Sequence, residues 1–162
     1  MMKVVIVGGV AGGAGTAARL RRNDETAEII MLERGSYISY ANCGLPYYIG
    51  GVITDKDALQ LQTPERFHAR FNVDVRVDSQ VVSVDTEKKC VVVRHGEETY
   101  EESYDKLVLS PGAGPVRPGI PGIGENHVFT LRNIPDTYAI FDFVKEHGPA
   151  SCAVIGAGFI GL

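Results

Sequence analysis

Uninterrupted apolar runs separated by polar segments predict a strand, a glycine turn, a helix and a second strand at the start of the chain. Residues 3–7 form a β-branched run typical of a strand buried on both faces of a sheet. Glycines follow at once, and residues 14–22 are rich in alanine, leucine and arginine, which favours a helix. Residues 28–33 form a second buried run that ends in Glu33. This order of elements is typical of a βαβ unit with a parallel sheet.

Shorter apolar segments in the middle of the chain predict a small antiparallel insertion. Apolar runs separated by turn residues predict short strands at residues 73–77, 80–85, 89–94 and 98–103. Before them, Thr63 as the cap and Pro64 at the first helical position predict a short helix through Phe71. A further buried run at residues 104–110 is expected to return to the main sheet.

A connection rich in proline and glycine at residues 115–124 separates these elements from a second unit. The pattern beyond it predicts a short strand at 128–131 and a helix at 135–146, whose inward residues are Ile140, Phe141 and Val144. A buried strand from Cys152 then leads into an intact G-x-G-x-x-G made of Gly156, Gly158 and Gly161.

These elements predict an α/β fold in two parts. Residues 1–113 are expected to form the amino-terminal part of a Rossmann-like domain, with a parallel sheet, helices on both faces and a small antiparallel β insertion. Residues 114–162 are expected to hold a connection and the start of a second Rossmann-like domain. Because the second glycine turn is not followed by its helix, strand and acidic residue, we expect this chain to be a piece of a longer one.

Composition narrows the class of protein. The 162 residues are 44% hydrophobic and 22% charged, as in a globular protein with one good core. The net charge of −4 gives no basic footprint for nucleic acid, and no apolar run reaches membrane-spanning length or resembles a signal peptide. We therefore expect a soluble cytoplasmic protein. The three cysteines and four histidines show neither a disulfide framework nor the spacing of a metal site.

The first glycine turn carries the signals of a dinucleotide site. Gly8 permits a tight turn, Gly13 permits close packing of the helix on the strand, and the free amides of the helix start can bind a pyrophosphate. Glu33 follows Gly13 by 20 residues, the spacing of an acid that accepts hydrogen bonds from a ribose. Val10 departs from the pattern, which has glycine there. A purely structural glycine turn is the alternative.

The stretch from Ser39 to Tyr48 places a lone cysteine among small and aromatic residues. Asn42 can cap a helix that starts at or near Cys43. Pro46 is tolerated only in the first turn of a helix, so the Cys43 thiol would lie at a helix N-terminus. Free amides and the helix dipole there favour a thiolate, so Cys43 is the candidate reactive atom. The alternative is a small buried side chain beside a turn. For Cys90 and Cys152 we predict core packing.

These segments together resemble the single-cysteine pyridine nucleotide-disulfide oxidoreductases, in particular coenzyme A-disulfide reductases, including those fused to a rhodanese domain that act on persulfides. The resemblance covers the whole chain and is most specific at residues 39–47, where Tyr40 replaces the usual phenylalanine. The other matching segments are residues 7–13, 33–34, 61–65, 104–113 and 130–133.

By that resemblance, FAD binds along the first glycine turn, with its pyrophosphate near Gly12 and Gly13 and its adenosine ribose on Glu33. The backbone near Val81 would contact adenine, and NADH or NADPH would bind the second glycine turn as co-substrate. The branch commonly lacks the middle glycine, so Val10 fits. The cofactor-binding positions that the resemblance implies are Gly8, Gly12, Gly13, Glu33, Arg34, Val81, Ser110, Gly112, Ala113, Arg132, Gly156, Gly158 and Gly161.

The resemblance also implies a substrate: coenzyme A disulfide, a persulfide or another small thiol-derived molecule. Family members place substrate-binding residues at the positions of Arg19, Arg22, Ser39 and Asn42. The two arginines stand three apart, share a helix face and could clamp phosphates, although a solvated surface pair is the alternative. The full-length protein is expected to be a homodimer without nucleic-acid or membrane partners.

One cysteine without a neighbour cannot close an internal disulfide, so its oxidised form must be a mixed disulfide or a sulfenic acid. In the reductase interpretation, NAD(P)H reduces FAD, and the flavin reduces Cys43, which exchanges with the substrate. Related oxidases and peroxidases instead cycle a sulfenic acid, and they carry a histidine where this chain has Ala11. A catalytically incomplete FAD-domain fragment, and a flavin electron carrier without a nicotinamide domain, are further alternatives.

Overall fold

A four-stranded parallel sheet forms the centre of the fold in the computed structural model, which describes residues 1–156. Val5, in the middle of β1, pairs with Ile30 on one side and with Leu107 on the other. The α/β class and the return of the segment 104–110 to the main sheet are therefore confirmed. In spatial order the strands are β3 (Asp74–Arg76), β2 (Glu28–Leu32), β1 (Lys3–Val7) and β7 (Lys106–Leu109).

Strand β3 corrects one prediction, because it belongs to the parallel sheet and not to the antiparallel insertion. It pairs with β2 in parallel, from Ile30 with Asp74 to Leu32 with Arg76. The physical reason is helix α3 (Pro64–Phe71), which lies between β2 and β3 in the chain and connects the two strands. A strand that is reached through a crossover helix enters the sheet in parallel.

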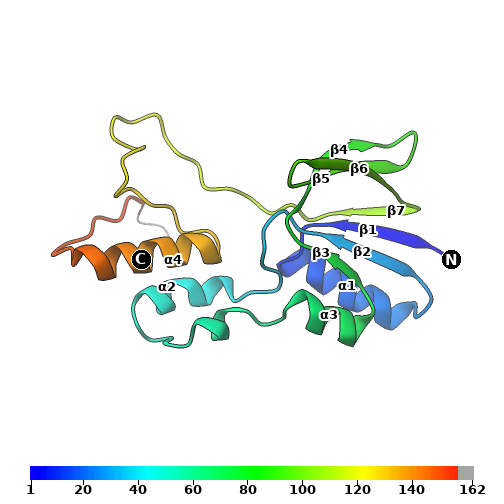
Figure 1. Cartoon of the computed structure of the whole chain (residues 1–162), viewed down its shortest axis with the longest axis horizontal. Helices are drawn as coiled ribbons and strands as arrows, with labels where there is room; N and C mark the ends of the chain where they lie inside the picture. Colours follow the sequence, from blue (N-terminus) through cyan, green and yellow to red (C-terminus); the bar gives the residue numbers. More distant parts are fainter. Residues whose placement is uncertain (157–162) are drawn as a thin grey trace.

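Two helices cover one face of this sheet (Figure 1). Helix α1 (Ala11–Asn23) begins three residues before its predicted start, and α3 has the predicted cap, with the Arg66 N–H donating to Thr63 Oγ1 at 3.3 Å. Alternate strand residues point toward these helices, as expected of a pleated sheet. The core on this side contains Val4, Ile6, Ala14, Ala17, Ile29, Met31, Phe67 and Val73.

A three-stranded antiparallel sheet covers the other face, where the sequence predicted helices (Figure 1). Val91 and Val93 of β5 pack on Val5, Ile30 and Leu32 of the central sheet. The buried Cys90 confirms its predicted core position, and burial raises the pKa of its thiol. The sheet consists of β4 (Ser79–Asp85), β5 (Cys90–His95) and β6 (Glu98–Ser103).

Charged side chains join the two sheets at one edge. Glu102 of β6 is buried, and its carboxylate bonds Lys3 Nζ at 2.6 Å and Arg76 Nη1 at 2.5 Å. Burial raises the pKa of the Glu102 carboxyl, but the hydrogen bonds and charges of Lys3 and Arg76 outweigh burial and hold that pKa below its ordinary value. Glu102 therefore stays ionised and links β1, β3 and β6.

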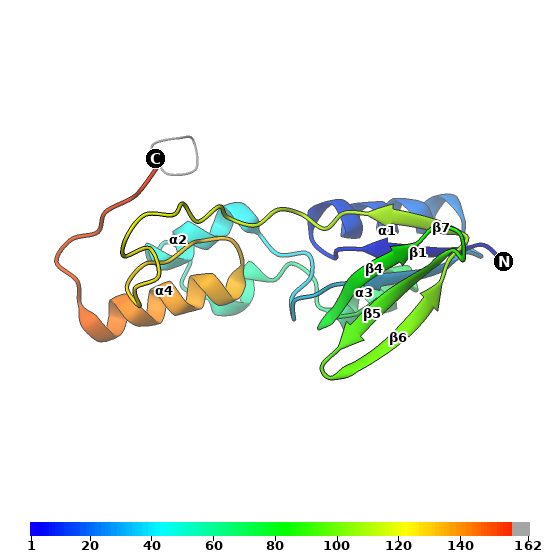
Figure 2. The ribbon, with the colours of Figure 1, turned by 90° about the horizontal axis from the view of Figure 1, so that it is seen from above.

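Short helices and one long helix form a second packing unit beside the sheets. The chain makes a 3₁₀ turn at Asn42–Gly44, α2 (Leu45–Ile49) and a second 3₁₀ turn at Lys56–Leu59, and returns much later as α4 (Ile134–His147). Figures 1 and 2 show α2 and α4 side by side at the end of the molecule away from the sheets. Tyr48 packs on Phe141, with ring centroids 5.0 Å apart, and Ile134 is fully buried beneath them.

Several predictions for the second half of the chain are wrong. Residues 128–131 form no strand: the Val128 N–H bonds Glu125 O in a turn, so it cannot join a ladder. Residues 152–155 form no strand either, because no strand in residues 1–156 lies beside them, and Cys152 is exposed. Val144 of α4 is exposed, since only the first half of this helix is well covered. Gly158 and Gly161 lie outside the described residues.

Candidate functional site

The turn after β1 needs glycine for two separate reasons. Gly8 has φ of +98°, and a Cβ there would overlap the carbonyl oxygen of Ser110. A Cβ on Gly13 would overlap the carbonyl oxygen of Gly8, so close helix–strand packing also requires glycine. Val10 stands at the helix N-cap with φ of −94°, so this position does not have the positive φ that demands glycine.

Gly12 opens space at the start of α1. A Cβ on this residue would overlap the Ser110 hydroxyl, which approaches from the loop after β7. Val10, Ala11 and Gly12 face the same cleft, and the first amides of a helix have no partner within the helix. The positive end of the 13-residue α1 therefore points at a cleft that can accept phosphate.

Glu33 follows β2 and fixes two loops through its carboxylate. Oε2 accepts a hydrogen bond from the Gly9 N–H at 2.7 Å, and Oε1 accepts one from the Gly35 N–H at 2.8 Å. The residue is only 9% exposed, yet it lines the cleft. Each carboxylate oxygen has a second lone pair, so Glu33 can hold its own loops and still accept hydrogen bonds from a ribose.

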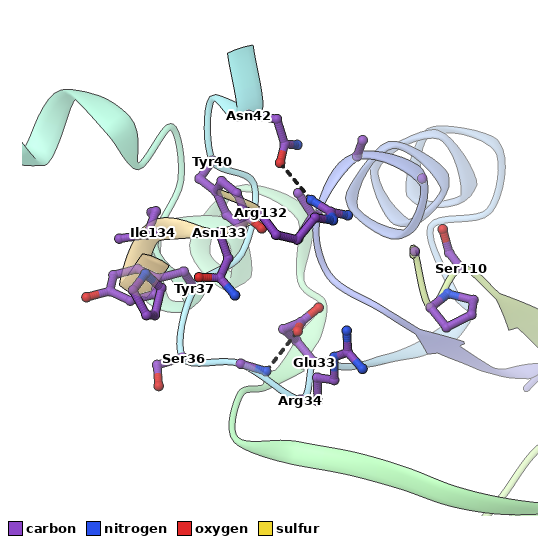
Figure 3. A pocket seen from close by; sticks show the side chains of 17 residues that line it. Glu33, Arg34, Ser36, Tyr37, Tyr40, Asn42, Ser110, Arg132, Asn133 and Ile134 are labelled. Atoms are coloured by element: carbon purple, nitrogen blue, oxygen red, sulfur yellow. Dashed lines mark hydrogen bonds between the residues drawn. The ribbon is translucent and has the colours of Figure 1, made fainter. Parts of the chain in front are cut away.

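The cleft collects residues from four distant parts of the chain (Figure 3). Seven predicted site residues line it: Gly12, Glu33, Arg34, Asn42, Ser110, Gly112 and Arg132. Ala113 is adjacent, and its carbonyl accepts from Arg132 Nε at 2.9 Å. Gly8 and Gly13 form the turn after β1 but do not line the cleft. Val81, on the β4 bulge, and Gly156, with φ of +114°, are not among the lining residues.

Sequence reasoning missed several cleft residues. Ser36 and Tyr37 line the cleft just beyond Glu33, and Asn133 and Ile134 line it at the start of α4. The first pair had a usable signal, because ligands of open α/β sheets bind beyond the carboxyl ends of the strands. Asn133 had the signal of a helix cap, and its Oδ1 does accept from the Asp136 N–H at 2.8 Å.

The turn around Cys43, residues 41–44, is called the cysteine turn here, and it differs from the prediction in one contact. Pro46 does lie in the first turn of α2, but Asn42 caps no helix: the N-cap positions are Ala41 and Gly44, without side-chain bonds. Asn42 Oδ1 instead accepts from Arg132 Nη1 at 3.2 Å (Figure 3). Cys43 is exposed, which removes the alternative of a buried packing residue.

A second groove runs along α1, on the other side of a shared wall. Val10, Ala11 and Tyr40 line both the cleft and this groove. Tyr40 is 9% exposed, and burial, followed by the charges of Glu33 and Asp136, raises the pKa of its hydroxyl against the opposing effect of Arg132. Tyr40, together with Val10 and Ala11, therefore forms the wall between the two cavities.

Small side chains of α1 form the floor of the groove, and basic residues stand at one end. Arg22 and Arg70 both lie over the Phe71 ring, at 6.0 and 5.2 Å from its centroid. Of the predicted substrate residues, Arg22 and Ser39 line the groove and Asn42 lines the cleft, whereas Arg19 is exposed and lines neither. The structure thus places Arg70, which sequence reasoning missed, beside Arg22.

Within residues 1–156, no helix is long and apolar enough to cross a membrane. No group of three or more histidine, cysteine, aspartate or glutamate side chains in this part of the chain could hold a metal ion.

Comparison with known proteins agrees with this geometry. A coenzyme A disulfide reductase of Staphylococcus aureus (strain JH9) is 43% identical over 164 residues, which cover all of this chain and 37% of that protein. The chain therefore spans little more than a third of this curated relative.

Three solved structures share the fold, at 34–57% sequence identity. Reduced Bacillus anthracis CoADR-RHD is 57% identical with a TM-score of 0.96, over 99% of this chain and 29% of that one. An NAD-dependent persulfide reductase from A. fulgidus is 34% identical (TM-score 0.87, 90% and 28% covered). A water-forming NADH oxidase from Lactobacillus brevis is also 34% identical (TM-score 0.89, 99% and 36% covered).

The model of the pyridine nucleotide-disulphide oxidoreductase family matches residues 2–162, nearly the whole chain. That match agrees with the glycine turn, the buried acid after β2 and the exposed lone cysteine described above. The chain therefore belongs to the pyridine nucleotide-disulphide oxidoreductase family.

Proposed function

We propose that the protein is an FAD-dependent NAD(P)H oxidoreductase that reduces coenzyme A disulfide, or a related disulfide or persulfide, through Cys43. The observation that carries this proposal is the position of the cysteine turn. Cys43 is exposed, its neighbour Asn42 lines the cofactor cleft, and Tyr40 of the same segment lines the groove as well. The Cys43 side chain lines neither cavity, but its segment borders both, which supports a role between cofactor and substrate.

The cleft residues fit a flavin dinucleotide. The space beside Gly12, which a Cβ would fill, and the free amides at the start of α1 suit a pyrophosphate. The Glu33 carboxylate suits a ribose, and the Arg132 guanidinium supplies a positive charge in the same cleft. When bound, FAD would pass electrons from a reduced nicotinamide to sulfur, the chemistry that side chains alone cannot supply.

The groove fits the substrate class of the curated relative. Coenzyme A is long and carries several phosphates, and the groove joins a floor of Ala14, Gly15 and Ala18 to the basic pair Arg22 and Arg70. Guanidinium groups bind phosphate in a bidentate manner, and both arginines are already oriented by the Phe71 ring. We assign the phosphates of the substrate to this end and its sulfur to the end near Ser39.

Thiol–disulfide exchange at Cys43 accounts for the sulfur chemistry. The Cys43 thiolate attacks one sulfur of the substrate disulfide, a new S–S bond forms with the enzyme, and the old S–S bond breaks. The leaving thiolate takes a proton from solvent and departs as free thiol. Reduction of the mixed disulfide by two electrons, which bound FAD would supply, and uptake of one proton would release the second thiol and return Cys43 as a thiolate.

An oxidase that cycles a cysteine sulfenic acid is the second candidate, since the Lactobacillus brevis NADH oxidase is 34% identical to this chain. Ala11 argues against it, because the oxidases and peroxidases of the resemblance carry a histidine at that place. A third candidate concerns the isolated chain, which spans 37% of its curated relative: by itself it would be an FAD-domain fragment without turnover.

A flavin spectrum and a thiol assay separate these outcomes. The purified full-length protein is expected to show flavin absorbance, to be bleached by NADH or NADPH without oxygen, and to release thiol from coenzyme A disulfide. Cys43→Ser should abolish thiol release and leave flavin reduction intact, whereas Cys152→Ser, at the other exposed cysteine, should change neither. Thiol release that survives Cys43→Ser would refute the role of Cys43. Rapid oxygen consumption without thiol release would favour the oxidase.

A further inference from the structure

Arg132 joins three segments of the chain at the edge of the cofactor cleft. Its Nε donates to the Ala113 carbonyl at 2.9 Å, and its Nη1 donates to Asn42 Oδ1 at 3.2 Å. Figure 3 shows the Asn42 and Arg132 side chains pointing toward each other, joined by this hydrogen bond. One guanidinium therefore ties the cysteine turn to the loop that follows β7.

The backbone of Arg132 is itself fixed at the start of α4. Its N–H donates to Asp136 Oδ2 at 2.9 Å, and Asn133 Oδ1 accepts from the Asp136 N–H at 2.8 Å. The next residue, Ile134, is fully buried against the aromatic residues of α2 and α4. Because the backbone is held by these capping bonds, the planar guanidinium is presented in one orientation.

The cysteine turn has few contacts of its own. It is three residues long, and the Gly44 N–H closes it onto the Ala41 carbonyl at 2.9 Å. Buried packing flanks the turn at Tyr40 and Leu45, and the Ala41 N–H donates to Leu59 O at 2.8 Å, so the Cys43 side chain itself has no buried support. In the part of the chain that the structure describes, the Arg132–Asn42 bond is the one side-chain hydrogen bond made by residues 41–44.

We propose that Arg132 is a positioning residue for Cys43, which it holds at the edge of the cofactor cleft through the Asn42 side chain. This rests on the proposed function only in naming Cys43 as the reacting atom. The planar fork of arginine serves two acceptors at once, Ala113 O and Asn42 Oδ1, which a single ammonium group does not reproduce. A hydrogen bond to a charged group restrains the turn by roughly tenfold in its opening equilibrium.

The test measures the turn directly, by hydrogen exchange of the Gly44 and Leu45 amides, whose N–H groups bond Ala41 O and Asn42 O across the turn. Both rates are resolved by mass spectrometry in the purified full-length protein. Arg132→Met and Asn42→Ala should each raise both rates about tenfold. The double variant should raise them no further, because both substitutions remove the same bond.

Two matched variants sharpen the result. Asn42→Asp keeps an acceptor oxygen and should restore rates close to those of the wild type. Arg117→Met removes an exposed arginine from the same connecting loop and should leave both rates unchanged. Flavin content is measured by absorbance for every variant, because Arg132 also lines the cofactor cleft. The Asn42 variants keep the Arg132 guanidinium, so they remove the hydrogen bond without removing that charge from the cleft.

Three outcomes would overturn the proposal. Unchanged rates in either single variant would show that the bond does not restrain the turn, and a hundredfold effect in the double variant would show two independent contacts. Exchange that rises equally throughout residues 134–147 would show a general loosening of α4 in place of positioning. Failure of the protein to reduce coenzyme A disulfide would refute the proposed function but would leave these rates, and this test, unaffected.

Discussion

Replacing Glu33 by glutamine removes a charge on which two loops of the cofactor cleft depend. The carboxylate accepts from the Gly9 N–H at 2.7 Å and from the Gly35 N–H at 2.8 Å, and the residue is only 9% exposed. Glutamine keeps the shape but offers one acceptor, so its NH₂ group must face a backbone N–H. One charge-assisted bond is lost and the other becomes neutral. With about 1.5–3 kcal/mol for each charged bond, the free energy of unfolding should fall by about 2–4 kcal/mol.

The assay combines urea unfolding, followed by circular dichroism, with flavin titration followed by fluorescence. Glu33→Gln should lower the urea midpoint with little change in slope and weaken flavin binding at least about tenfold, because the ribose loses a charged acceptor. Glu28→Gln, at the start of the strand that Glu33 follows, is the matched control. The Glu28 side chain is 42% exposed and pairs with Lys3 at 3.4 Å, so its loss should cost less than about 1 kcal/mol.

A Glu33→Gln protein whose unfolding free energy lies within about 0.5 kcal/mol of the wild type would refute this reasoning, because it would show that solvent replaces the two backbone contacts at no cost. An equal loss in Glu28→Gln would refute it too, since the effect would then follow from net charge.

Two further predictions concern the sheet and its surroundings. Gly13→Ala should lower the free energy of unfolding by at least about 2 kcal/mol and abolish flavin binding, because the new Cβ overlaps a backbone carbonyl. Gly15→Ala has open space around the new Cβ and should be neutral or slightly stabilising in the same thermal melts. The pKa of Glu102 is held below its ordinary value, so the stabilisation by this carboxylate is present above that value and is lost as the pH falls through the lower pKa of the folded state. Glu102→Gln should lower the free energy of unfolding by about 2 kcal/mol at pH 7 and flatten the acid limb of a plot of stability against pH. An unchanged acid limb would contradict this assignment.

The first βαβ unit could be predicted from sequence because its signals are local. A β-branched run gives β1, Gly8 and Gly13 mark the turn, and Glu33 directly follows β2, so each signal lies within a few residues. The structure adds the reason for the one mismatch: Val10 occupies a position that does not have the positive φ of a glycine.

Contacts between distant segments could not be predicted in this way. Asn42 next to a proline-containing helix has the local signal of a cap, yet its side chain bonds Arg132, 90 residues later. The strand at Asp74–Arg76 reads like the strands that follow it, and only its crossover through α3 places it in the parallel sheet. Arg70 joins Arg22 because α3 packs beside α1, which no spacing in the sequence reveals.

The position of β7 also sets the order in which the cofactor cleft can be built during synthesis. Lys3 at the start of β1 bonds Asp105, which is 102 residues later, and β7 then carries Ser110 and Gly112 into the cleft. At ribosomal rates of roughly 5–20 residues per second, β1 exposes an apolar, unpaired edge for roughly 5–20 seconds before its partner emerges. A nascent chain therefore has the glycine turn and Glu33 early, but it cannot enclose a dinucleotide until the last strand has docked. Substitutions that slow the docking of β7 should lower the yield of cofactor-loaded protein even where they leave the finished cleft unchanged.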